Sequence, residues 1–218
     1  MAKQGAATEL EIIDICKRLN AKNMLASADG NVSVRVSDGE ILITPTGLNK
    51  AFITPEDMAV IDLGNRVLKG KPSGERLIHL EVYKRCPEAK AVVHAHPPTA
   101  IAWSVAFPDD EELPFESLSE LILAAGRIPI AKYARPGTPA MAERITPFLP
   151  DHRVIVMARH GALAWGESLM EAYNGMERLE HSAQILARAQ SLGAITKLPQ
   201  AEIEALWELR RQLGKRTL

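Results

Sequence analysis

The feature that most restricts the fold is a pair of histidines, His94 and His96, at the end of the apolar run in VVHAHPP. The run predicts a β-strand, and side chains alternate along a strand, so both imidazoles project from one face. A third histidine, His160, occurs far downstream in ARHGALAWG. A fold that returns His160 to this face would bring three imidazoles together.

Three neutral imidazoles are a typical ligand set for Zn²⁺ or a similar divalent transition ion. Three protein ligands leave a coordination position open, which is characteristic of catalytic rather than structural metal sites. The alternative is that these histidines are ordinary core or surface residues. The motifs around them favour the metal site.

Composition narrows the class of protein. The chain has 218 residues, 46% of them hydrophobic, which predicts a single domain over residues 1–218. Lys plus Arg number 26 against 27 for Asp plus Glu, so charge gives no reason to expect a nucleic acid or an anionic membrane as partner. No signal-like start and no apolar run of about 18 residues occurs, and we expect a cytoplasmic protein with buried thiols at Cys16 and Cys86.

Capping residues and helical periodicity predict the helices. Thr8 with Glu11, and Ser168 with Glu171, form capping boxes that would start a first helix and a long helix to about Leu192. Apolar spacing predicts further helices over residues 73–85, 98–106, 116–125, 138–148 and 200–213.

Alternation and turn residues predict the strands. NVSVRV and ILIT flank the turn SDGE as one hairpin, and AVIDL and RVLKG flank Gly64 and Asn65 as a second. Further strands are predicted in AVV, IPIAKY, VIVM and ALAW. Hairpins mixed with helices favour an α/β fold with an antiparallel sheet covered by helices over a doubly wound parallel fold.

Three segments rich in small polar residues suggest an anion site: GNVS, TPTG and KPSGE. Gly47 and Gly74 permit close backbone approach, and Ser73 with Gly74 would lie at a helix N-terminus, which favours an anion. Each segment alone is ordinary turn chemistry. Their joint occurrence predicts a phosphate cradle.

Glu75 follows Ser73 and Gly74 directly. A carboxylate at a helix start commonly compensates the helix dipole and has no other role. Beside an anchored phosphate, however, it would be suited to act as a general acid/base or as a labile metal ligand.

The ordered motifs GNVSVR, TPTG, KPSGE, VVHAH, IPIAKYARPGT and ARHG resemble the class II aldolase/adducin family, in particular its bacterial L-fuculose-phosphate aldolase branch, over about residues 8–190. The resemblance implies a three-layer α/β/α sandwich around a mostly antiparallel sheet, a homotetramer with active sites at subunit interfaces, and Zn²⁺ as cofactor. The residues that match the metal ligands are His94, His96, His160 and Glu75, the last also matching the catalytic acid/base. The residues that match the phosphate-binding positions are Asn31, Thr46, Gly47, Ser73 and Gly74.

The implied reaction is retro-aldol cleavage of a ketose 1-phosphate, such as L-fuculose 1-phosphate, to dihydroxyacetone phosphate and an aldehyde. In the family a tyrosine from the neighbouring subunit serves the aldehyde half of the substrate. Here Glu120 takes that position, and no tyrosine follows Tyr173.

This departure leaves other functions open. A glutamate at this position is similar to the methylthioribulose-phosphate dehydratase branch, where a carboxylate performs acid/base work, so Glu120 is a candidate catalytic residue; it is equally compatible with a solvated helix position. That branch lacks an equivalent of Glu75. The ARPGT segment keeps a phospho-keto-acid decarboxylase open. A non-catalytic adducin-like binding module is disfavoured by the three histidines with Glu75.

Overall fold

The structure, a computed structural model, describes residues 2–214, with side chains from Thr8 onward, so the ends of the predicted domain lie outside the described residues. Its centre is one eight-stranded sheet in the order β4-β3-β2-β1-β5-β8-β7-β6. All neighbouring strands are antiparallel except β6 and β7, which are parallel, so the predicted mostly antiparallel sheet is confirmed. The strands are β1 (Asn31–Arg35), β2 (Glu40–Ile43), β3 (Ala59–Asp62), β4 (Val67–Lys69), β5 (Ala91–Ala95), β6 (Ile130–Ala131), β7 (Val154–Met157) and β8 (Gly161–Gly166).

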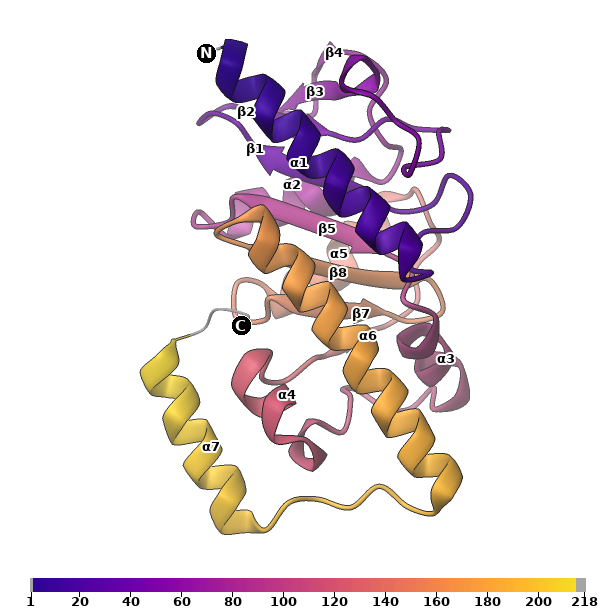
Figure 1. Ribbon diagram of the computed structural model, residues 1–218, viewed down its shortest axis with the longest axis vertical. Coiled ribbons are helices and arrows are strands. Elements are labelled where there is room, and N and C mark those ends of the chain that lie inside the picture. The colour runs from indigo at the N-terminus through magenta and orange to yellow at the C-terminus, as the bar shows by residue number, and fades with distance from the viewer. Residues whose placement is uncertain (1, 215–218) are drawn as a thin grey trace.

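Helices cover both faces of this sheet (Figure 1). The apolar residues of α1, α3, α4, α6 and α7 share a core with one face, and those of α2 and α5 share a core with the other. The predicted three-layer α/β/α sandwich is therefore confirmed. The α-helices are α1 (Ala2–Ala21), α2 (Arg76–Arg85), α3 (Pro98–Ala106), α4 (Ser119–Ala124), α5 (Pro139–Ile145), α6 (Leu169–Leu192) and α7 (Gln200–Leu213).

The central strand β5 shows how the two cores are separated. Val92 packs into the core under α2 and α5, whereas Val93 packs into the core under α1 and α6. Strand alternation explains this, because consecutive side chains leave opposite faces. Both faces of β5 are covered, and all five of its residues are buried, which explains why AVV is a continuous apolar run.

Two helix starts differ from the sequence predictions. Helix α1 begins at Ala2, so Thr8 lies inside the helix and the predicted capping box there is wrong. The segment before Thr8 contains three alanines, which have the highest helix propensity and extend the helix. Helix α2 begins at Arg76 instead of Ser73: residues 74 and 75 form a turn, and the Ser73 N–H donates to the Thr44 carbonyl 3.1 Å away, so Ser73 belongs to the loop that runs beside Thr44.

Three other predicted elements are shorter than expected. The segment 116–125 divides into the 3₁₀ turn Phe115–Ser117 and α4, because Leu118 between them is extended. The segment 138–148 becomes α5 followed by the 3₁₀ turn Thr146–Phe148, where Pro147 supplies no N–H. Of IPIAKY only Ile130–Ala131 pairs as a strand, at the edge of the sheet.

Other predictions are confirmed. Ser168 caps α6 and its side chain accepts a hydrogen bond from the Glu171 N–H at 3.1 Å. Cys16 and Cys86 are both buried free thiols. Among residues 2–214 there is no helix with the length and apolar character needed to span a membrane.

Candidate metal centre

Three separate parts of the chain bring four polar side chains together. His94 lies on β5, and His96 follows the end of that strand. His160 precedes β8, and the pairing of Ala95 with Ala162 places it beside the two other histidines. Glu75 occupies the position before α2. One ligand atom from each of the four residues lies within 4.8 Å of all the others, and this group could hold a metal ion.

Glu75 lies between two of the histidines. Its Oε2 is 3.2 Å from His94 Nε2, and its Oε1 is 3.1 Å from His160 Nε2. His94 Nε2 is also 3.3 Å from His96 Nε2. The four ligand atoms therefore converge on one point, as a coordinated cation requires.

The hydrogen bonds of the histidines fit a cation at this point. His94 Nδ1–H donates to the Ala162 carbonyl at 2.8 Å, which leaves Nε2 of the neutral ring without a hydrogen. That nitrogen faces a carboxylate oxygen and another imidazole nitrogen. His160 Nε2 is buried and, among the described residues, has no partner with hydrogen-bond geometry. A divalent ion would satisfy these lone pairs together.

The pKa shifts of the group also suit metal binding. Burial raises the pKa of Glu75, but the neighbouring His160 and His94 outweigh this effect and hold it well below its ordinary range. Burial, with smaller contributions from His94 and His160, lowers the pKa of His96 to about 3. An ionised carboxylate and a neutral imidazole are the forms that bind metal ions.

The segments predicted to bind phosphate lie beside Glu75. Thr46 N–H donates to the Lys71 carbonyl at 3.0 Å, and Pro45 and Pro72 form an isolated β-bridge, so TPTG and KPSGE run side by side. Thr46, Gly47 and Gly74 are exposed, whereas Ser73 is buried. Gly47 has a φ of +74°, which explains a glycine at this position.

Asn31 connects the GNVS segment to the same place. It is the first residue of β1 and pairs with His94 across the sheet. Its Nδ2 donates to Glu75 Oε2 at 3.1 Å. Asn31 thus contacts the Glu75 carboxylate itself, whereas Ser73 Oγ accepts a hydrogen bond from the Glu75 backbone N–H at 3.3 Å.

The sequence predictions missed two buried polar residues near the site. His79 lies one helical turn after Glu75 and contacts Asn31; the four-residue spacing in a predicted helix was the available signal. Lys50 is buried, and its amine donates to the Ala28 and Leu48 carbonyls, both at 2.7 Å. No pattern in its segment distinguishes it from an exposed lysine.

Glu120, the other predicted catalytic residue, does not belong to the group of four. It lies exposed on α4, and its Oε2 accepts a hydrogen bond from Ser119 Oγ at 2.8 Å. That hydrogen bond lowers the pKa of Glu120. The structure therefore separates Glu120 from the residues with which sequence analysis grouped it.

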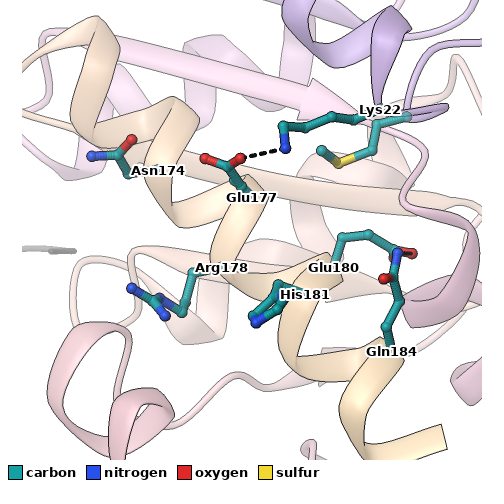
Figure 2. A pocket seen from close by; sticks show the side chains of 8 residues that line it. Lys22, Asn174, Glu177, Arg178, Glu180, His181 and Gln184 are labelled. Carbon is teal, nitrogen blue, oxygen red and sulfur yellow. Dashed lines mark hydrogen bonds and ion pairs between the residues drawn. The ribbon is translucent and has the colours of Figure 1, made fainter. Parts of the chain in front are cut away.

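Figure 2 shows a pocket of about 600 Å³ on α6, and none of the group of four is among the residues that line it. Lys22 and Glu177 form a 2.7 Å ion pair across it. The Glu180 carboxylate at its wall accepts hydrogen bonds from the N–H groups of Thr99 and Ala100. Lys22 and Glu177 thus pair with each other. Glu180 is hydrogen-bonded to the start of α3, the helix that follows His96.

Comparisons with known proteins agree with this architecture. Residues 10–187 match the family described as Class II Aldolase and Adducin N-terminal domain. A 3-oxo-tetronate 4-phosphate decarboxylase from Haemophilus influenzae is 33% identical over 74% of this chain and 78% of its own. An L-fuculose phosphate aldolase from Methanococcus vannielii is 35% identical over 80% of this chain and 93% of its own.

Solved structures give the same result. YgbL from Escherichia coli, described as a putative aldolase/epimerase/decarboxylase, has a TM-score of 0.85 and 30% identity, and the match covers 93% of this chain and 99% of YgbL. The family match spans most of the chain and includes all four residues of the group. The chain therefore belongs to the class II aldolase and adducin family, and the two curated relatives named here, a decarboxylase and an aldolase, are carbon–carbon lyases.

Proposed function

We propose that this enzyme breaks a carbon–carbon bond of a small phosphorylated substrate and leaves the enediolate of dihydroxyacetone phosphate. Glu75 takes up a proton from water once substrate is bound and delivers it to the enediolate carbon. The observation that carries the proposal is the position of Glu75, whose carboxylate touches His94 and His160 while its backbone directly follows Ser73 and Gly74. A substrate held by its phosphate on those two residues has its carbonyl end near a group that can hold and return a proton.

His94, His96, His160 and Glu75 would hold the metal, for which we propose Zn²⁺. When bound, such an ion supplies Lewis-acid stabilisation of negative charge on the substrate oxygens. Asn31, Thr46, Gly47, Ser73 and Gly74 would bind the phosphate. Binding energy from the phosphate orients the reacting carbon and thereby contributes to turnover as well as to affinity.

A ketose 1-phosphate such as L-fuculose 1-phosphate is our first substrate class. The bond between C3 and C4 breaks, the C4 hydroxyl gives up its proton, and an aldehyde leaves; the electron pair stays on C3 as the enediolate. The proton on the C4 hydroxyl needs an acceptor. We propose a homotetramer in which Glu120 of a neighbouring subunit takes this role, since within one chain Glu120 is exposed and apart from the group of four.

Decarboxylation of a phosphorylated keto acid is the second candidate. Loss of carbon dioxide from 3-oxo-tetronate 4-phosphate leaves the same enediolate, and because the leaving carboxylate is already ionised, no residue has to accept a hydroxyl proton. Two observations favour it: the relative of that name, and the position of Lys132 and Arg144, which line a small hollow with His160 and would attract a carboxylate.

One assay separates the candidates. The purified protein with one equivalent of Zn²⁺ is offered a panel of ketose 1-phosphates and 3-oxo-tetronate 4-phosphate, and dihydroxyacetone phosphate is detected by a coupled reaction. An aldehyde formed with it identifies an aldolase, and carbon dioxide a decarboxylase. Formation of a dehydrated product with the carbon chain intact would contradict both.

A further inference from the structure

The α2 histidine next to the site, His79, is completely buried and uses both ring nitrogens. Its Nε2 contacts Asn31 Oδ1, and its Nδ1 lies 2.7 Å from Ser33 Oγ. Ser33 Oγ in turn lies 2.9 Å from the hydroxyl of Tyr83, one turn further along α2. A continuous chain of polar groups therefore runs from Tyr83 to Asn31 and, through Asn31 Nδ2, to Glu75.

The hydrogens in this chain have one consistent arrangement when His79 is neutral. An ionised Glu75 only accepts hydrogen bonds, so the Asn31 amide must present Nδ2 to Glu75 and Oδ1 to His79. His79 must then carry its hydrogen on Nε2, which leaves Nδ1 to accept from the Ser33 hydroxyl. Ser33 accepts from Tyr83.

Burial keeps His79 in this neutral form, since it lowers the pKa of the ring to about 3. Asn31 is also almost completely buried, at 2% exposure, so bulk water does not replace a missing partner. Without a donor at His79 Nε2, the amide could rotate and turn its oxygen toward the Glu75 carboxylate, where two acceptors repel.

We propose that His79 is a positioning residue that holds the Asn31 amide in the orientation that donates to Glu75. This inference rests on the proposed role of Glu75 in proton transfer. The Asn31 Nδ2 group carries two hydrogens, so donation to Glu75 leaves one for a substrate phosphate. His79 therefore acts on the proton-transferring carboxylate through Asn31, with no contact of its own with the substrate.

The first test needs neither metal nor substrate. NMR of the full-length protein with ¹⁵N-labelled histidine distinguishes the two neutral tautomers, and loss of one signal in His79→Gln assigns His79. We expect a neutral ring with hydrogen on Nε2. A hydrogen on Nδ1, or a doubly protonated ring at neutral pH, would overturn the proposal.

The second test compares two conservative variants in the zinc-loaded enzyme. The side-chain amide of His79→Gln can place an N–H near the Nε2 position, whereas that of His79→Asn reaches only the Nδ1 position. We expect His79→Asn to lower kcat roughly 10-fold to 100-fold, the usual effect of losing an outer partner of a metal site, and His79→Gln to retain most of it. KM should change less than about threefold in His79→Gln, and should rise up to about tenfold in His79→Asn, because the rotated Asn31 amide no longer donates to the phosphate.

Equal losses in the two variants, or losses that follow melting temperature or zinc content, would show that His79 only stabilises the fold. If wild-type protein acts on neither substrate class, the proposed function fails, but the tautomer measurement still decides whether His79 orients Asn31. Should His79→Asn not fold, the tautomer in the wild-type protein decides alone.

Discussion

The two acidic residues that sequence analysis assigned to catalysis lie in opposite environments. Glu75 is partly buried, touches two histidines and Asn31, and stands beside the phosphate loops. Glu120 is exposed on a short helix and is bonded to its neighbour Ser119. One chain thus brings together the residues of the proposed metal and phosphate sites, whereas the role proposed for Glu120 requires a neighbouring subunit.

This difference reflects the cost of burying charge. A buried carboxylate needs partners that favour its charged form, so the histidines and the amide around Glu75 indicate what Glu75 does. An exposed carboxylate is stable in water with no partner at all. The local contacts of Glu120 therefore do not indicate a role. The activities of substituted proteins are needed to distinguish the role of Glu75 from that of Glu120.

The largest effect is expected at the histidines. His94→Ala removes a fully buried proposed ligand whose Nδ1 is fixed by Ala162, so the protein should lose its metal and nearly all activity. Metal per chain is measured by elemental analysis. His181→Ala is the matched control, since His181 is exposed on α6. Full activity in metal-free protein would refute the metal centre.

The next effect concerns proton transfer. Glu75→Gln keeps the size of the side chain and removes its charge, so kcat should fall roughly 100-fold or more, as for loss of a general acid/base. Zinc should largely remain on the three histidines. Glu208→Gln, on the exposed face of α7, is the control. Unchanged turnover would reduce Glu75 to a helix-start residue.

The phosphate loops should give a smaller effect, mainly on binding. Ser73→Ala removes a buried hydroxyl beside Glu75, and we expect KM to rise about tenfold, the equivalent of one hydrogen bond to a charged group, with zinc content intact. The unphosphorylated sugar should be a poor substrate for the wild-type enzyme. Similar kcat/KM values for both sugars would remove the phosphate from the proposal.

Glu120 should respond differently to the two substrate classes. Glu120→Gln should lower cleavage of a ketose 1-phosphate about tenfold if the carboxylate accepts the C4 hydroxyl proton, and should leave decarboxylation unchanged, because that reaction has no such proton. Zinc content and melting temperature should match the wild type. Equal losses on both substrates would show that Glu120 acts in some other way.

The smallest effect is on stability. The pKa of His79 is about 3 in the folded protein and near 6.5 when unfolded, so between these values only the unfolded state binds the proton. The free energy of unfolding should therefore decrease as the pH falls through this window, by at most about 1.4 kcal/mol per pH unit. His79→Gln should show a weaker decrease. Urea unfolding with a chelator present measures the free energy of unfolding of both proteins at each pH. The same pH dependence in the wild type and in His79→Gln would contradict the lowered pKa of His79.

The local sequence pattern was sufficient to predict secondary structure wherever a short segment determines its own conformation. The two hairpins, the apolar β5 and the Ser168 cap of α6 follow from residues within a few positions of one another. Prediction failed where a distant contact competes with local preference. Ser73 could begin a helix, but its N–H is bonded to Thr44, and the helix begins three residues later.

The sequence by itself determined that His94 and His96 share a face, because period two is a property of the strand, and that a third histidine and a carboxylate were available. Only the tertiary structure decided that they meet. The antiparallel pairing of β5 with β8 brings His160 to His94, and that with β1 brings Asn31 opposite it. Such pairings join residues that are far apart in the chain, so the spacing of residues within one segment does not predict them. The burial of His79 behind Asn31 follows from the same pairings and from the packing of α2 on the sheet.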